Sequence, residues 1–173
     1  AGFLPAFKEI AKGDGVIGMY ETLQNPAMIS MIGPTPIKIA SQYTLGAMYA
    51  HEMLLFCSLF AMTISILHVI GHTRKEEDLG LTELVRSFQV GRQANSLAVL
   101  LETIVINLLL ALLIGGVMTG YGLDTISAEG SFLFGLSVGI AGIIGGVIAL
   151  VMAQIMPASS GATGFALGIM GLM

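Results

Sequence analysis

The stretch that decides the fold is ANSLAVLLETIVINLLLALLIGGVM, residues 94–118, in which Glu102 is the only charged side chain. A bilayer core is about 30 Å thick, so a helix that crosses it needs roughly 20 mostly apolar residues. Lipid offers the backbone no hydrogen bonds, so a spanning segment is a helix or part of a closed barrel. This run is too long and too continuously apolar for alternating barrel strands. It therefore predicts a transmembrane helix.

Two similar runs lie on either side of this stretch. The run at about 44–71 has a core from Met53 to Ile70 in which His68 is the only polar ionisable side chain, and the run at about 131–156 has no charge. A fourth run begins near Ser160 and reaches Met173 unfinished, so we expect the chain to belong to a longer protein. The predicted fold class is all-α: a polytopic transmembrane helical bundle with three complete spans and the start of a fourth.

The composition agrees with a membrane protein. The 173 residues are 55% hydrophobic and 10% charged, whereas a typical soluble domain has about 25% charged residues. The alternative is an unusually apolar subunit buried in a soluble complex. The net charge of −4 gives no indication of nucleic-acid binding. The single Cys57 excludes an internal disulfide, and we find no pattern of catalytic, cofactor-binding or metal-binding residues.

Basic residues predict the orientation of the loops. The loop at 72–93 carries four of them, whereas the loop at 119–130 has none. Cytoplasmic loops are enriched in Lys and Arg, so we expect 72–93 to be cytoplasmic and 119–130 to be outside. Residues 1–43, which are rich in proline, would then form an extracytoplasmic segment at the membrane surface, and 44–173 would form the transmembrane domain.

The loop at 72–93 also contains a short amphipathic pattern. Four apolar residues follow one another at i, i+3, i+4 and i+7, which predicts one stripe on a helix. Asp78 can cap the start of this helix. Such a helix can dock in a groove on a cytoplasmic partner, or it can lie with its stripe among lipid headgroups. The stripe consists of Leu81, Leu84, Val85 and Phe88.

The sequence of this loop resembles the first cytoplasmic loop of type-2 ABC exporter permeases. The resemblance lies in residues 73–84, TRKEEDLGLTEL, and in Val90-Gly91-Arg92. More narrowly, the chain resembles permeases of polyketide-antibiotic exporters. Two positions depart from the pattern: Leu81 and the Ser159-Ser160 pair stand where such permeases often have a basic residue. Further matching pieces are Asn25-Pro26-Ala27-Met28, Gly33-Pro34, Tyr43-Thr44-Leu45-Gly46, Ala153-Gln154 and Gly161-Ala162-Thr163-Gly164.

The resemblance implies an exporter of amphiphilic compounds such as antibiotics in a bacterial plasma membrane. The chain has no Gly-x-x-x-x-Gly-Lys-Ser/Thr phosphate loop, so ATP and Mg would bind to a separate ABC ATPase subunit, and this chain by itself would not be an enzyme. Other expected partners are the rest of the permease or a second copy, the lipid bilayer and the substrate. The residues implied to couple with the ATPase are Glu76, Glu77, Gly80, Leu81, Glu83, Leu84, Val85 and Phe88.

Polar groups within the predicted spans are the other candidates for function. An Asp or Lys at bilayer depth costs about 2.5–3.5 kcal/mol on insertion scales, so ionisable residues there usually face the protein interior. Glu102 and Asn107 either line a substrate pathway or form interhelical hydrogen bonds. His51 and Glu52 either join that pathway or reach water at the outer end of their helix. Two other functions stay open: a proton-coupled secondary transporter that uses Glu102, and a membrane scaffold or sensor that recruits a cytoplasmic partner.

Glycines recur at small-residue spacing in the last two apolar runs. Such spacing lets helix backbones approach closely in lipid. We therefore predict tight helix packing at these glycines rather than a gating hinge. They are Gly135, Gly139, Gly142, Gly146, Gly164 and Gly168.

Overall fold

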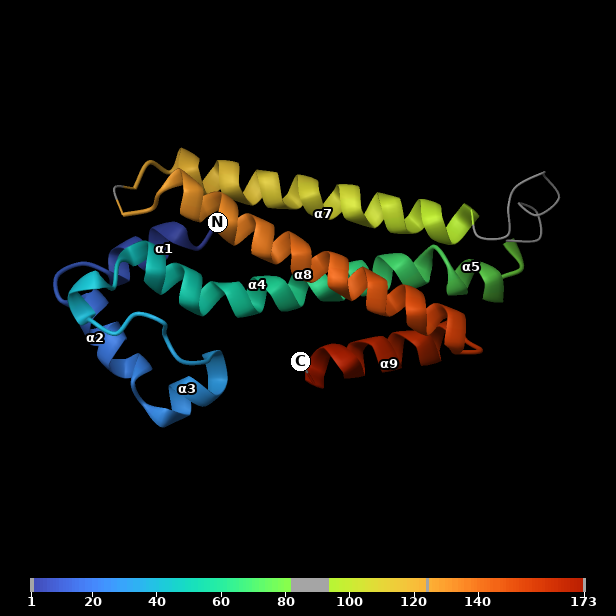
Figure 1. The fold of residues 1–173 in the computed structure, drawn as a ribbon, viewed down its shortest axis with the longest axis horizontal. Helices are drawn as coiled ribbons and strands as arrows, with labels where there is room; N and C mark the ends of the chain where they lie inside the picture. Colours follow the sequence, from blue (N-terminus) through green and yellow to red (C-terminus); the bar gives the residue numbers. More distant parts are fainter. Residues whose placement is uncertain (1, 82–93, 124, 173) are drawn as a thin grey trace. The chain divides into compact units, whose positions relative to one another are not determined.

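The computed structural model describes residues 2–81, 94–123 and 125–172, and its described residues form helices and no strands (Figure 1). Three helices are long: α4 (Leu45–Gly71), α7 (Ala94–Gly120) and α8 (Ala128–Ile155). The shorter elements are α1 (Leu4–Ile10), α2 (Gly15–Leu23), α3 (Pro26–Ile32), the 3₁₀ turn η1 (Ala40–Gln42), α5 (Arg74–Asp78) and α9 (Ser159–Leu172).

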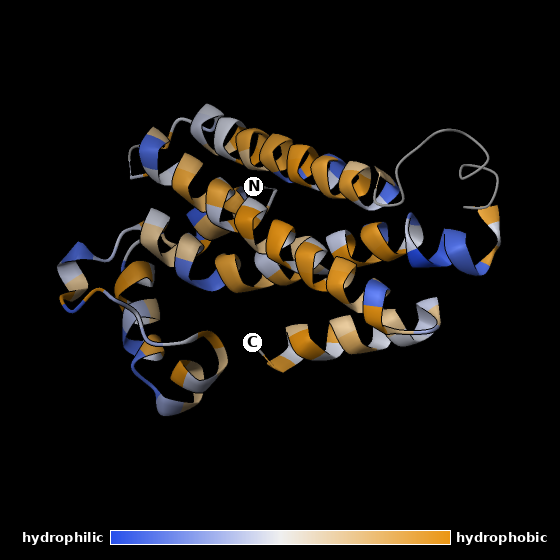
Figure 2. Cartoon of the chain, turned by 45° about the vertical axis from the view of Figure 1, so that its right-hand side comes forward, coloured by the Kyte–Doolittle hydropathy of each residue, from blue (hydrophilic) through white to orange (hydrophobic). Residues whose placement is uncertain are grey.

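Three helical stretches are long and apolar enough to cross a membrane: Leu45–Asp78, Ala94–Gly120 and Ala128–Ile155. A helix of 27 residues, such as α4 or α7, is roughly 40 Å long, which exceeds the thickness of a bilayer core. Figure 2 shows mostly hydrophobic residues along α4, α7 and α8 and hydrophilic ones over α5, so the apolar part of the first stretch ends with α4. The predicted fold class is confirmed: this is an all-α polytopic membrane protein.

Helix α8 begins three residues before the predicted start at residue 131. The reason is a local cap. The hydroxyl oxygen of Ser127 accepts a hydrogen bond from the backbone N–H of Gly130 at 3.0 Å, and this satisfies one of the unpaired donors in the first helical turn. The polar residues before 131 therefore belong to the helix rather than to the loop.

The chain divides into two compact units, each built from segments that are distant in sequence. Unit 1 consists of Ala1–Cys57 with Ala111–Ser137, and unit 2 consists of Ser58–Leu110 with Val138–Met173. Unit 1 contains the N-terminal helices and η1, whereas unit 2 contains α5 and α9.

Aromatic side chains hold the short N-terminal helices to the rest of unit 1. The Phe7 ring of α1 meets the Tyr49 ring of α4 edge-on, with centroids 5.1 Å apart. Tyr49 also lies against Phe134 of α8, with centroids 5.6 Å apart. Aromatic pairs in such geometry contribute about 0.5–1.5 kcal/mol beyond the burial of their area. The N-terminal segment is therefore attached to the long helices by a buried aromatic row.

Glycines permit close helix approach at several points within each unit. In unit 1, a Cβ on Gly135 of α8 would collide with the carbonyl oxygen of Ala111 in α7. In unit 2, a Cβ on Gly146 would lie 2.7 Å from Cγ2 of Thr103. Gly145 was not among the predicted packing glycines, yet a Cβ on it would lie 2.8 Å from the Cα of Met62 in α4. Backbone-to-backbone contact of this kind requires the absence of a side chain.

The other predicted packing glycines differ from these. Gly139 is buried in α8. A Cβ on Gly164 or Gly168 of α9 would meet no described atom within 4 Å. Packing at these three glycines therefore stays a prediction.

Small and branched apolar residues form the core of unit 2. Ile66 and Val69 of α4, Ala149 of α8 and Ala162 of α9 are fully buried in one cluster, together with Val99 of α7. Alanines on α8 and α9 allow these helices to lie close to the branched side chains of α4. Helix α9 is therefore anchored by its buried face to the centre of unit 2.

We expect Gly135→Ala to lower the free energy of unfolding by about 1–3 kcal/mol, because the new methyl group meets a backbone carbonyl that cannot rotate away. Gly164→Ala is the matched control, since its methyl group enters open space in the described residues. Denaturation of the purified, detergent-solubilised protein measures both. Equal stability of the two variants would show that α7 and α8 do not approach closely at Gly135.

Candidate functional site

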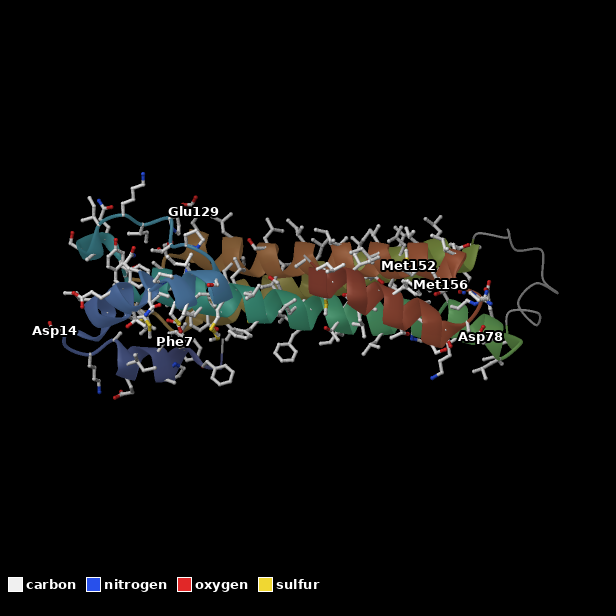
Figure 3. The ribbon with its side chains drawn as sticks, turned by 90° about the horizontal axis from the view of Figure 1, so that it is seen from below. Phe7, Asp14, Asp78, Glu129, Met152 and Met156 are labelled. Carbon is white, nitrogen blue, oxygen red and sulfur yellow. The ribbon has the colours of Figure 1, made fainter. Side chains whose placement is uncertain are left out.

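Helix α5 lies at the start of the predicted cytoplasmic loop and contacts the turn between α8 and α9 within unit 2. The Asp78 carboxylate accepts a hydrogen bond from the backbone N–H of Ser159 at 2.7 Å. The Arg74 guanidinium donates to the backbone carbonyl of Pro157. Figure 3 shows Asp78 at the same end of this unit as Met156, the residue that follows α8. Two side chains one helical turn apart therefore hold both sides of the turn.

Arg74 also organises α5 itself. Its Nη1 lies 2.9 Å from Oε2 of Glu77, and its Nε lies 3.2 Å from Oδ1 of Asp78. The second contact is an ion pair rather than a hydrogen bond, because Nε has no hydrogen-bond partner among the described residues. The same cation thus neutralises the carboxylate that binds Ser159.

The contacts of Asp78 alter its titration. The backbone N–H of Ser159 lowers the pKa of this carboxyl most, the Ser159 hydroxyl adds to the effect, and the charge of Arg74 contributes further. A carboxyl whose pKa is lower in the folded protein stabilises the fold above its unfolded pKa, and this contribution is lost as the pH falls through the folded value. The link to α9 is therefore fully formed at neutral pH.

Asp78 has a contact that the sequence did not predict, because its carboxylate binds the first residue of α9. Its expected role as a cap of the following loop helix stays a prediction, since most of that helix lies outside the described residues. The partner lies 81 residues away in the chain, so local sequence could not reveal it. Most of the predicted coupling stripe, with Glu83, Leu84, Val85 and Phe88, lies outside the described residues, and Leu81 is exposed.

Asn107 forms a polar junction between helices of unit 2. Its amide nitrogen donates to the hydroxyl of Ser65 in α4 at 3.0 Å and to the carbonyl of Thr103 in its own helix at 2.9 Å. Both amide hydrogens are thereby used. A Cβ on Gly142 of α8 would collide with the Asn107 amide oxygen, so the glycine leaves room for this side chain. Asn107 makes the interhelical hydrogen bond that was one of its two expected roles.

Glu102 has a different environment. Its carboxylate lies 3.7 Å from Nε2 of His68, and 56% of its side chain is exposed. That distance suits an ion pair with a protonated histidine but exceeds a hydrogen bond. The His68 ring also lies near the His72 ring, with centroids 4.7 Å apart and the planes tilted by 56°. An acidic side chain is therefore presented at the surface of a spanning helix, beside a pair of histidines.

Among its described residues, unit 1 contains three side chains with buried, unpaired polar atoms, which are His51, Glu52 and Tyr43. Nε2 of His51, Oε1 of Glu52 and the hydroxyl of Tyr43 are buried, and none has a hydrogen-bond partner in the described part of the chain. Burial and the nearby charge of Glu52 raise the pKa of Tyr43. These atoms are available to a polar group from outside the described residues.

A cavity of about 260 Å³ lies in the same unit. It is partly open and is lined by the first two turns of α4, the end of α7, the start of α8 and the connection between α7 and α8. Its walls are mostly apolar, and a space of this size is at the lower limit of small-molecule sites. The lining residues include Ala47, Ala50, Met118, Ile126 and Phe134.

Metal binding finds no support in the described residues, where no three His, Cys, Asp or Glu side chains are grouped to hold an ion. The residues that the sequence analysis missed are Ser65, Thr103, Arg74 and Ser159. Ser65 and Thr103 look like ordinary small residues in apolar runs, and only their contacts with Asn107 distinguish them.

Comparison with known proteins shows a similarity to a multidrug efflux system permease protein of Mycobacterium tuberculosis. The two are 30% identical over 151 residues, which is 86% of this chain and 26% of the relative. The chain thus spans about a quarter of the length of that protein. No family model matches the chain, and no solved structure matches it.

A double-mutant cycle between Ser65→Ala and Asn107→Ala should give a coupling energy of about 0.6–1.7 kcal/mol, the range measured for interhelical hydrogen bonds in membranes. The stabilities of the four proteins in detergent supply the cycle. Thr63→Ala, on the same helix, serves as the control partner for Asn107, because the Thr63 hydroxyl bonds to Leu59 and contacts Met170 instead. Additive effects of the Ser65 and Asn107 changes would show that the junction contributes no coupling.

Proposed function

We propose that this chain is part of the membrane-spanning permease of an ATP-driven exporter that moves amphiphilic compounds, such as antibiotics, out of a bacterial cell. The observation that carries the proposal is the 30% identity to a multidrug efflux permease across 86% of the chain. The three apolar helices supply the membrane part that such a role requires. Within this class, the loop and its flanking motifs favour an exporter of polyketide antibiotics.

The ATPase in this proposal is a separate ABC subunit that binds ATP and Mg. It would dock on the cytoplasmic loop at 72–93, whose charge and apolar stripe suit a cleft with a polar rim. The rest of the permease, or a second copy, would complete the pathway. His51, Glu52 and Glu102 are the candidate polar contacts of the substrate, because each presents a carboxylate or imidazole at membrane depth.

A proton-coupled transporter is the second candidate. The exposed carboxylate of Glu102 beside His68 favours it, since protonation of such a pair can accompany transport. The two mechanisms differ in their energy source. Export that requires ATP and survives collapse of the proton gradient supports the first, whereas export that needs only the gradient supports the second.

We expect Leu84→Asp and Phe88→Asp in the complete permease to abolish ATP-dependent export while membrane insertion is unchanged. A charge in the apolar stripe would prevent burial in the ATPase cleft, where apolar anchors carry most of the binding energy. Export of ethidium from proteoliposomes that contain the permease and its ATPase measures the effect. The control is Leu79→Asp, an exposed residue that precedes the stripe. Full export by both stripe variants would favour the headgroup role of the loop.

The orientation is tested by cysteine labelling in a Cys57→Ala background. Tyr121→Cys, in the exposed connection after α7, should react with an impermeant maleimide added to intact cells. Lys75→Cys, on the exposed side of α5, should react only after the membrane is permeabilised. The opposite pattern would place α5 outside the cell, where no ATPase could reach it.

A further inference from the structure

The base of the loop is fastened on more than one side within unit 2. Thr73, which precedes α5, is buried, and its hydroxyl donates to the carbonyl of Val69 in α4 at 2.6 Å. At the other end of the loop, the side-chain amide of Asn95 in the first turn of α7 donates to the carbonyl of His72 at 3.1 Å. Helix α5 therefore starts from a fixed point, and its side chains make a further attachment to the α8–α9 turn.

The charges of α5 match the electrostatics of that turn. The end of a helix that exposes carbonyls is partly negative, and the end that exposes N–H groups is partly positive. Arg74 binds the carbonyl of Pro157, just beyond the C-terminus of α8, and Asp78 binds the N–H of Ser159, the first residue of α9. Each charge thus lies at the helix end of opposite sign. About a quarter of either side chain is exposed.

The turn leads directly into the core of unit 2. Ala162, one turn after Ser159, and Ala166, one turn further, are fully buried against Ile66 and Val69 of α4. A displacement of the first turn of α9 must therefore shift side chains in a close-packed core. Besides its direct connection along the chain to α4, α5 is thus connected to the spanning helices through the α8–α9 turn and α9.

We infer that Arg74 and Asp78 are positioning residues that transmit movement of the loop at 72–93 to the α8–α9 turn. This inference rests on the proposed function, because the movement would originate in the ATPase. The pair acts as a mechanical link: Asp78 holds α9, and Arg74 holds the end of α8. Neither residue needs to contact substrate or ATP.

The decisive variant is the charge exchange Arg74→Asp with Asp78→Arg. It preserves the net charge and an oppositely charged pair at i, i+4, yet it presents the wrong sign to both helix ends. Lys75→Ala is the matched control, since Lys75 lies next to Arg74 on α5 and is exposed. Ser159→Pro removes both the N–H donor and the hydroxyl that act on Asp78, at a first helical position where proline is well tolerated. Ser159→Ala keeps that N–H and should retain most of the wild-type behaviour.

Two measurements on the complete permease with its ATPase test the inference. Hydrogen exchange measures the hydrogen bond between Asp78 and the Ser159 amide. In Asp78→Ala and in the exchange variant, this amide loses a charged acceptor and should exchange about 10-fold faster. In Lys75→Ala its exchange rate should not change. The number of ATP molecules hydrolysed per ethidium exported reports transmission. That ratio should rise about 5-fold or more in the exchange variant and in Ser159→Pro, since a coupling of typical size is lost. Basal hydrolysis should be unchanged in Ser159→Pro, because Ser159 lies outside the loop at 72–93.

The outcomes separate the two proposals. Unchanged Ser159 exchange in Asp78→Ala, or faster exchange with an unchanged ATP-to-ethidium ratio, would overturn the inference and leave the proposed function intact. Absence of ATP-dependent export by the wild-type complex would overturn the proposed function, and with it the transmission role. If the exchange variant does not fold but Ser159→Pro does, the ATP-to-ethidium ratio of Ser159→Pro decides the test.

Discussion

The backbone of this chain must satisfy its own hydrogen bonds wherever it crosses lipid, and the rest of the structure depends on that constraint. It forces the apolar runs into the long helices α4, α7 and α8. It also disfavours charge along these helices, which hold few charged residues, whereas every residue of α5 is charged. Helix α5, which follows α4 directly, is therefore a polar segment at the end of an apolar helix.

Lipid provides no hydrophobic force to hold helices together, so other interactions must do so. In the described residues they include close helix approach at glycines and the buried polar junction at Asn107. The two coincide at Gly142, where the missing side chain leaves space for Asn107, whose amide binds Ser65. The glycine thus provides the space in which the Asn107 side chain can make its interhelical hydrogen bond.

The sequence was sufficient to predict the long helices, because their signal is a property of each run by itself. The expected bounds of 44–71 and 94–118 differ by no more than two residues from those of α4 and α7. It could not predict contacts between distant segments. Gly135 and Gly164 share the same spacing pattern, yet only Gly135 meets a neighbouring backbone in the described residues. Likewise, nothing near Asp78 in the sequence indicates that its partner is the backbone of Ser159.

The length of α5 gives the link to α9 a further consequence. A helix of five residues is far too short to be stable alone, because its first turn fixes several residues for a single hydrogen bond. Its ion pairs at i, i+3 and i, i+4 add only a few tenths of a kcal/mol each. The contacts of Arg74 and Asp78 with the α8–α9 turn must therefore supply much of what keeps α5 helical. By thermodynamic linkage, whatever favours the helical form of α5 also favours its attachment to the turn. Folding of α5 and its attachment to α9 are then one event, so α5 is connected to the α8–α9 turn only when it is helical.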